Sequence, residues 1–83
     1  MIKNDTIDLV KADGATFADL KASVQGNKLY LDAQVGHWRL EAGDSVIHHQ
    51  GDGTDVTYEV INPGYRQGLA VIPAHYQADI KRQ

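Results

Sequence analysis

Residues 45–61 read SVIHHQGDGTDVTYEVI, and this stretch decides the fold. Every second residue of 56–60 is apolar, which is the period of a β-strand with one face in a core. Residues 50–53 combine two glycines with a short carboxylate, a composition that favours a tight turn. The stretch therefore predicts two antiparallel strands joined by a hairpin across residues 48–58.

The same alternation, ended by turn formers, recurs on both sides of this hairpin. Strands are predicted at residues 6–11, 15–24, 28–32, 37–40, 45–49, 54–61, 69–72 and 75–80. Asp13-Gly14 supplies the positive-φ positions of a first hairpin. Segment 15–24 also fits a helical stripe, but the turn at 25–27 and the clean alternation after it favour a strand. Pro73 cannot donate to a ladder, so it should mark an edge, a bulge or a strand start.

About six to eight short strands, with turns roughly every 8–12 residues, are typical of a small barrel or sandwich. We therefore predict an all-β fold of antiparallel strands, in one domain spanning residues 1–83. The predicted core consists of Ile7, Leu9, Phe17, Leu20, Val24, Leu29, Leu31, Trp38, Leu40, Val46, Val56, Tyr58, Val60, Leu69, Ile72 and Ile80. A chain of this size buries only about 60–65% of the surface that its unfolded form exposes. A homo-oligomer would bury more apolar surface and so stabilise the fold.

The composition of the chain excludes several classes of protein. The 83 residues are 42% hydrophobic and 23% charged, with 8 Gly and 2 Pro, which is close to the globular average and excludes collagen-like and low-complexity chains. The absence of cysteine excludes disulfides and is compatible with a reducing cytosol, so we expect a cytoplasmic protein. No apolar run approaches the roughly 18–20 residues that span a bilayer, and residues 1–5 do not resemble a signal peptide, so no membrane partner is expected.

Four histidines, His37, His48, His49 and His75, invite a metal-site hypothesis, because imidazole is the commonest metal ligand at neutral pH. His48 and His49 are adjacent on a predicted strand, however. Their side chains should point to opposite faces, where they cannot share one ion without a bulge. No His-Glu-x-x-His helix or cysteine pair is present either, so no metal site is predicted.

Acidic residues Asp44, Asp52 and Asp55 bracket the central hairpin, and paired carboxylates can act in acid/base chemistry or bind calcium. Turn chemistry is the simpler explanation, because Asp44 follows a glycine and Asp52 lies between two, where a short acceptor bonds the local backbone. No serine lies in a Gly-x-Ser-x-Gly elbow. The sequence therefore predicts no catalytic residue, no cofactor and no enzymatic activity.

Nucleic-acid binding is the next class to consider, because small β-barrels hold single strands on aromatic platforms. The candidate platforms are Tyr30, Trp38, Tyr58, Tyr65 and Tyr76, with Arg39 and Arg66 beside them. Charge opposes this function. The chain has 8 Lys+Arg against 11 Asp+Glu, a net charge of -3, and its cations are scattered along the sequence.

Loop 62–68 carries the strongest binding signal, because it presents Tyr65 and Arg66, residue types enriched at interface hot spots, between glycines. Together with His75 and Tyr76 of the next segment, they are the residues that we expect to contact a protein partner. The structural alternative is that Tyr65 folds back over the barrel end and Arg66 is simply solvated.

Several short motifs carry a family resemblance. They are Gly43-Asp44-Ser45-Val46-Ile47, Tyr58-Glu59-Val60, Asn62-Pro63-Gly64-Tyr65, Gly68 and Ile72-Pro73-Ala74-His75-Tyr76-Gln77. With them the chain resembles a small β module of uncharacterised bacterial and prophage-encoded proteins, and is similar to the β-domains of phage neck and tail-completion proteins. The resemblance implies a noncatalytic interaction or assembly module from a phage or mobile element. Two other functions remain open: an inhibitor that binds a host protein through an acidic surface, and a barrel that binds single-stranded nucleic acid.

Overall fold

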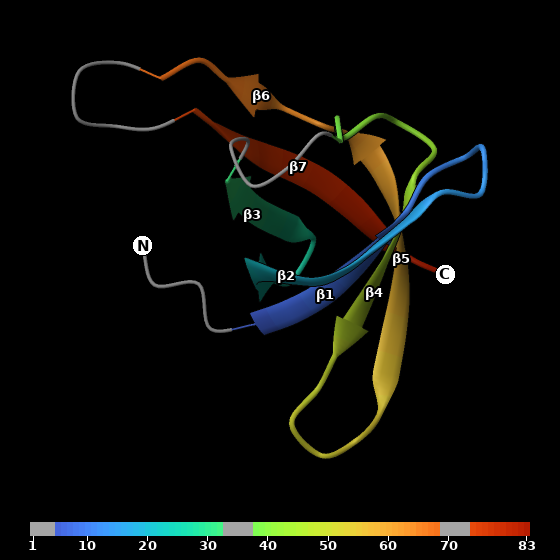
Figure 1. Ribbon diagram of the computed structural model, residues 1–83. Helices are drawn as coiled ribbons and strands as arrows, with labels where there is room; N and C mark the ends of the chain where they lie inside the picture. Colours follow the sequence, from blue (N-terminus) through green and yellow to red (C-terminus); the bar gives the residue numbers. More distant parts are fainter. Residues whose placement is uncertain (1–4, 33–37, 69–73) are drawn as a thin grey trace.

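The regular elements of the protein are all β-strands (Figure 1). The computed structural model describes residues 5–32, 38–68 and 74–83. Its strands are β1 (Asp5–Val10), β2 (Thr16–Gln25), β3 (Lys28–Asp32), β4 (Ser45–His49), β5 (Asp55–Asn62), β6 (Tyr65–Arg66) and β7 (His75–Arg82). The predicted all-β class is therefore confirmed. Within these ranges no helix has the length and apolar character needed to cross a membrane.

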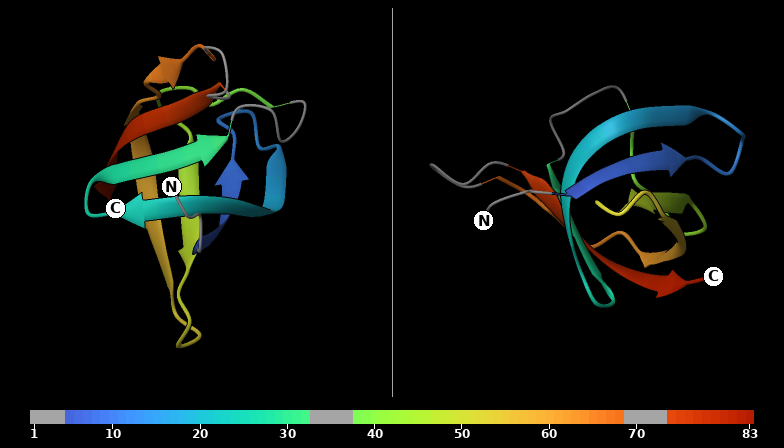
Figure 2. Two further views of the ribbon diagram at one scale, coloured as in Figure 1. Left: turned by 90° about the vertical axis from the view of Figure 1, so that its left-hand side faces the viewer. Right: turned by 90° about the horizontal axis from the view of Figure 1, so that it is seen from below.

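The strands form one antiparallel sheet that closes on itself (Figure 2). Its order is β3-β2-β1-β4-β5-β7-β6, and a further pairing of β3 with β7 completes a six-stranded barrel. Of the two architectures that the sequence left open, the protein has the barrel. β6 lies outside the closed ring, since among the described strands it pairs with β7 alone.

The central hairpin forms where the sequence predicts it. His48 pairs with Val56 across β4 and β5. In the turn, Asp52 Oδ1 accepts hydrogen bonds from the hydroxyl and the backbone N–H of Thr54, at 2.6 and 3.0 Å. These bonds, the hydroxyl bond above all, lower the pKa of the Asp52 carboxyl. Asp52 thus has the turn role that its position between two glycines predicts.

A bulge shapes the first hairpin, and it explains why segment 15–24 was ambiguous between helix and strand. The segment lies in β2, but the β1–β2 register shifts between Ile7 and Leu9. On the opposite strand Asp19 has φ 60°, and its backbone N–H donates to Asp8 Oδ1 at 3.0 Å. Because a bulge adds a residue to one strand and bends it, the side-chain period in β2 is broken there.

The barrel interior holds the core. Its buried apolar residues are Ile7, Leu9, Leu20, Ala22, Leu29, Leu31, Trp38, Leu40, Val46, Val60, Tyr76, Ala78 and Ile80. Phe17, Val24 and Tyr58 are only partly buried and pack against this cluster. Val56, predicted to be in the core, is half-buried. The predicted core residues Leu69 and Ile72 lie outside the described residues. Ala22, Tyr76 and Ala78 complete the core without having been predicted.

Two local predictions differ from the structure. Residues 38–40, predicted as a strand, form no ladder, although Trp38 and Leu40 are buried and Arg39 is exposed as the alternation requires. The predicted loop 62–68 contains strand β6, because its backbone continues along the edge of β7. The predicted strand 69–72, Pro73 and His37 lie outside the described residues.

Candidate binding groove

The four predicted partner-binding residues lie together on the ribbon formed by β6 and β7 (Figure 1). Tyr65 pairs with Tyr76 and Arg66 pairs with His75. Directly opposed residues of antiparallel strands share a face, and neighbours along a strand alternate between faces. The structure therefore brings all four onto one ribbon but divides them, with the two tyrosines on one face and Arg66 and His75 on the other.

A groove of about 760 Å³ lies on the tyrosine side. Residues 38–42 line one part of it, and Pro63, Tyr65 and Tyr76 line the rest. This volume falls within the range of about 300–1,000 Å³ that is usual for ligand-binding clefts. The side chain of Tyr65 is 55% exposed, whereas that of Tyr76 is buried. More than half of the Tyr65 surface therefore remains available for contact with a second molecule.

The groove opens where the chain segments before β4 and after β5 diverge. The backbone N–H of Gly43 donates to Val60 O, and the N–H of Val60 donates to Asp44 O, both at 2.8 Å. Beyond this point the pairing of β5 with β7 shifts register between Val60 and Asn62. Residues 38–42, which precede this contact, and Pro63, which follows it, line the groove.

Gly64 fixes the path of the chain from β5 into β6. Its carbonyl oxygen accepts the backbone N–H of Gln77 at 3.0 Å, and its own N–H donates to Asn62 Oδ1 at 3.0 Å. Gly64 has φ +56°, and a Cβ atom at this position would lie 2.2 Å from Gln77 O. Only glycine permits so close an approach of the two backbones. The placement of Tyr65 beside the groove depends on this contact.

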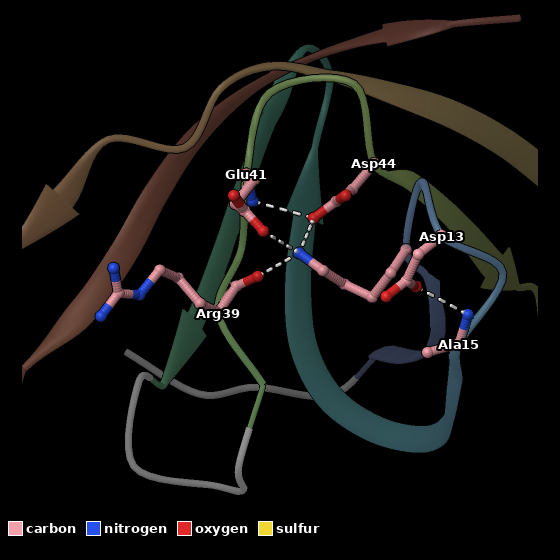
Figure 3. Close-up of polar contacts among 6 residues, drawn as sticks. Asp13, Ala15, Arg39, Glu41 and Asp44 are labelled. Carbon is pink, nitrogen blue, oxygen red and sulfur yellow. Dashed lines mark hydrogen bonds and ion pairs between the residues drawn. The ribbon is translucent and has the colours of Figure 1, made fainter.

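An ion-pair cluster around Lys11 anchors the 38–42 wall (Figure 3). The Lys11 ammonium donates to Asp44 Oδ2, to the carbonyl oxygen of Arg39, and to Glu41 Oε1 at 3.1 Å. Asp44, whose side chain is 2% exposed, also accepts the backbone N–H of Glu41 at 2.8 Å. Burial of Lys11 opposes its charge, but the hydrogen bonds that Lys11 donates to Asp44 and Glu41 prevail and raise its pKa.

Three aromatic rings form the floor and one side of the groove. The centroids of Tyr65 and Tyr76 are 5.4 Å apart in an edge-on arrangement, and those of Trp38 and Tyr76 are 6.0 Å apart. Both separations fall in the favourable range for ring pairs. Trp38 is 8% exposed, and its buried indole N–H has no hydrogen-bond partner among the described residues. An unsatisfied buried donor of this kind is uncommon in folded proteins.

The predicted separation of His48 from His49 is confirmed by the register of β4. His48 pairs with the buried Ile7, whereas His49 pairs with Thr6 on the outer face. His48 Nε2 lies 3.1 Å from Asp5 Oδ1. Asp5 also uses Oδ2 to accept the backbone N–H of Val24 at 2.8 Å, so this pair connects β1 with β2 and β4.

His49 lies between two aspartates. Its Nδ1 is 2.8 Å from Asp55 Oδ1 and its Nε2 is 3.0 Å from Asp8 Oδ2. These contacts, first that with Asp55 and then that with Asp8, raise the pKa of His49. Through His49, the carboxylates of Asp8 and Asp55 therefore connect β1, β4 and β5. Across the described ranges no group of three or more His, Asp or Glu side chains is placed to hold a metal ion.

Sequence reasoning placed Tyr65 and Tyr76 at a protein contact and considered Trp38 and Arg39 only for nucleic-acid binding, so it did not join residues 38–42 to β6 in one groove. Trp38 was predicted to be a core residue, which its burial bears out, yet it also lines the groove. Lys11 carried no signal, since its partner Asp44 lies 33 positions away. Comparison of the chain with protein-family models, with curated proteins and with solved structures gives no match, so the chemistry of the groove rests on its own residues.

Proposed function

We propose that this protein is a noncatalytic interaction module that binds a protein partner through the groove between residues 38–42 and β6. The observation that carries the proposal is the exposed Tyr65 ring at the edge of a wide, aromatic groove. Interface hot spots are enriched in tyrosine, tryptophan and arginine that cluster around such pockets. A role in phage assembly is the part of the proposal that rests on the motif resemblance alone.

The charge distribution favours a protein over nucleic acid as the partner. The net charge is -3, and the groove is lined by one arginine and one glutamate. A phosphate backbone requires several cations on one face. The acidic residues that bracket the central hairpin are already engaged, since Asp44 pairs with Lys11, Asp52 accepts from Thr54 and Asp55 pairs with His49. These contacts make the acidic turns less suited to a docking role.

Two tyrosines, one that lines the groove and one outside it, allow a matched experiment. Tagged wild-type protein, Tyr65→Ala and Tyr30→Ala are used to capture proteins from a lysate of the source cells. Tyr30 lies on β3, opposite Gln77, on the outer face of the sheet. We expect a protein retained by wild type and by Tyr30→Ala but reduced about tenfold or more with Tyr65→Ala, the usual effect of removing a hot-spot tyrosine.

Thermal melting provides the control for the capture experiment. The midpoint of Tyr65→Ala should stay close to that of the wild type, because its ring is more than half exposed. Equal capture by all three proteins would refute the groove as the binding site. Salt-sensitive binding of a labelled single-stranded oligonucleotide, lost in Tyr65→Ala, would replace the proposal with a nucleic-acid function.

A further inference from the structure

We infer that the element recognised by this groove is an extended peptide segment of the partner, which pairs with the open edge of β6 and places an apolar and an acidic side chain at the groove. The inference rests on the proposed function and specifies the chemistry of its ligand. Three independent features support it: the backbone of β6, the apolar surface of the groove, and the charge of Arg39.

The backbone of β6 points its free groups in the required direction. Gln77 donates its N–H to Gly64 O, so these two residues form a hydrogen-bonded position of the ladder. Positions alternate along antiparallel strands, so the next pair, Tyr65 with Tyr76, is of the non-hydrogen-bonded type. The N–H and C=O of Tyr65 therefore point away from β7, toward the open edge. A strand added there would bond both groups, as in other complexes formed by strand addition.

The apolar surface of the groove supplies the second feature. Trp38 lines the groove, although its indole N–H is itself buried. Pro63 and the Tyr65 ring beside it offer the apolar surface on which a side chain of the same peptide would lie.

Arg39 supplies the charge. Of the two charged side chains that line the groove, Glu41 is paired with Lys11, and Arg39 has no ion pair in the described part of the chain. The Arg39 side chain points away from the Lys11 cluster, to which it contributes only its backbone carbonyl (Figure 3). An acidic side chain in the peptide would therefore meet an exposed, unpaired guanidinium, with which a carboxylate can form a bidentate ion pair.

The experiment begins with a displayed library of random twelve-residue peptides selected on the wild-type protein. Selected peptides are synthesised and titrated into ¹⁵N-labelled protein. Because the chain has 1 Trp, the indole N–H of Trp38 gives a single resonance. We expect that resonance to shift on binding, together with the backbone amides of Tyr65 and Arg66. The selected sequences should combine an apolar with an acidic residue.

Backbone chemistry provides the decisive test. N-methylation of the peptide amide that bonds Tyr65 O should weaken binding about fivefold or more, the equivalent of one hydrogen bond, whereas N-methylation at the neighbouring amide should not. Arg39→Gln should weaken binding about threefold to fivefold, in a salt-dependent way, while the exposed Arg82→Gln at the far end of β7 should leave it unchanged.

The possible failures are distinguishable. Peptides that bind as helices, that ignore N-methylation at every position, or that leave the Trp38 indole resonance unmoved would overturn the inference. So would a library that yields no binder dependent on Tyr65. If protein capture still depended on Tyr65 in those cases, the interaction function would stand and the partner would present a folded surface instead of an extended segment.

Discussion

Removing the carboxylate of Asp44 should destabilise the protein far more than its position in a surface turn suggests. Asp44→Ala deprives the Lys11 ammonium, whose side chain is 12% exposed, of its buried partner. It also removes the acceptor of the Glu41 backbone N–H. Breaking a buried ion pair costs about 3–5 kcal/mol. Because the exposed Glu41 remains as a weaker partner for Lys11, we expect a loss of about 2–4 kcal/mol.

That loss is a large share of the total, since a domain of this length is stable by only about 4–12 kcal/mol. The melting temperature should fall by roughly 10–25 °C. Urea unfolding followed by the fluorescence of Trp38, together with thermal melting, measures both quantities. The double variant Lys11→Met/Asp44→Ala should recover part of the loss, because no buried charge is then left unpaired.

A second lysine–aspartate pair provides the control. Lys28 and Asp79 pair across β3 and β7, but their side chains are 52% and 45% exposed. Asp79→Ala should therefore cost no more than about 1 kcal/mol. If Asp44→Ala costs as little as Asp79→Ala, the Lys11 cluster does not anchor the 38–42 wall, and the structural basis of the groove would have to be reconsidered.

Three further predictions test the fold. Gly64→Ala should lower the free energy of unfolding by at least about 2 kcal/mol, since its Cβ would meet a carbonyl oxygen at 2.2 Å, whereas Gly51→Ala, with open space around it, should have little effect in the same urea titration. The raised pKa of His49 implies a stabilisation that is complete below its ordinary pKa of 6.5 and lost as the pH rises through the folded-state pKa. The melting temperature of the wild type should therefore exceed that of His49→Gln by a margin that shrinks from about pH 6 to about pH 8, and a constant margin would contradict this. Val60→Ala, fully buried, should cost about 2–3 kcal/mol in thermal unfolding, and Ile61→Ala, its 49% exposed neighbour, less than about 1 kcal/mol.

Alternation and turn chemistry made most strands of this fold predictable. Each is a local property: the hairpin across residues 48–58 follows from the period-two pattern of β5 and the glycines beside Asp52. The closing contact between β3 and β7 is not local, because it joins strands that are separated by more than forty positions. Alternation indicates that each strand has a buried face, but it does not indicate which strand lies beside it. The sequence pattern expected for a barrel is therefore the same as that expected for a sandwich.

The groove was predictable only in part, for the same reason. Tyr65 and Arg66 stand out by residue type in a short loop. Their division between two faces depends on β6, and two residues are too few to show a strand period. In the wall at residues 38–42 the side chains alternate between buried and exposed as predicted, but the backbone joins no ladder. The carbonyl oxygen of Arg39, which a neighbouring strand would otherwise bond, accepts a hydrogen bond from Lys11 instead. Side-chain contacts of this range leave no mark on local sequence.

The position of β7 between β3 and β5 bears on how the protein is made. Until residues 75–82 emerge from the ribosome, the nascent chain exposes one unpaired edge of β3 and another of β5. Such edges are templates for intermolecular pairing. Translation thus leaves an interval in which both unpaired edges are exposed, and β7 ends it by pairing with β3 and β5 at once.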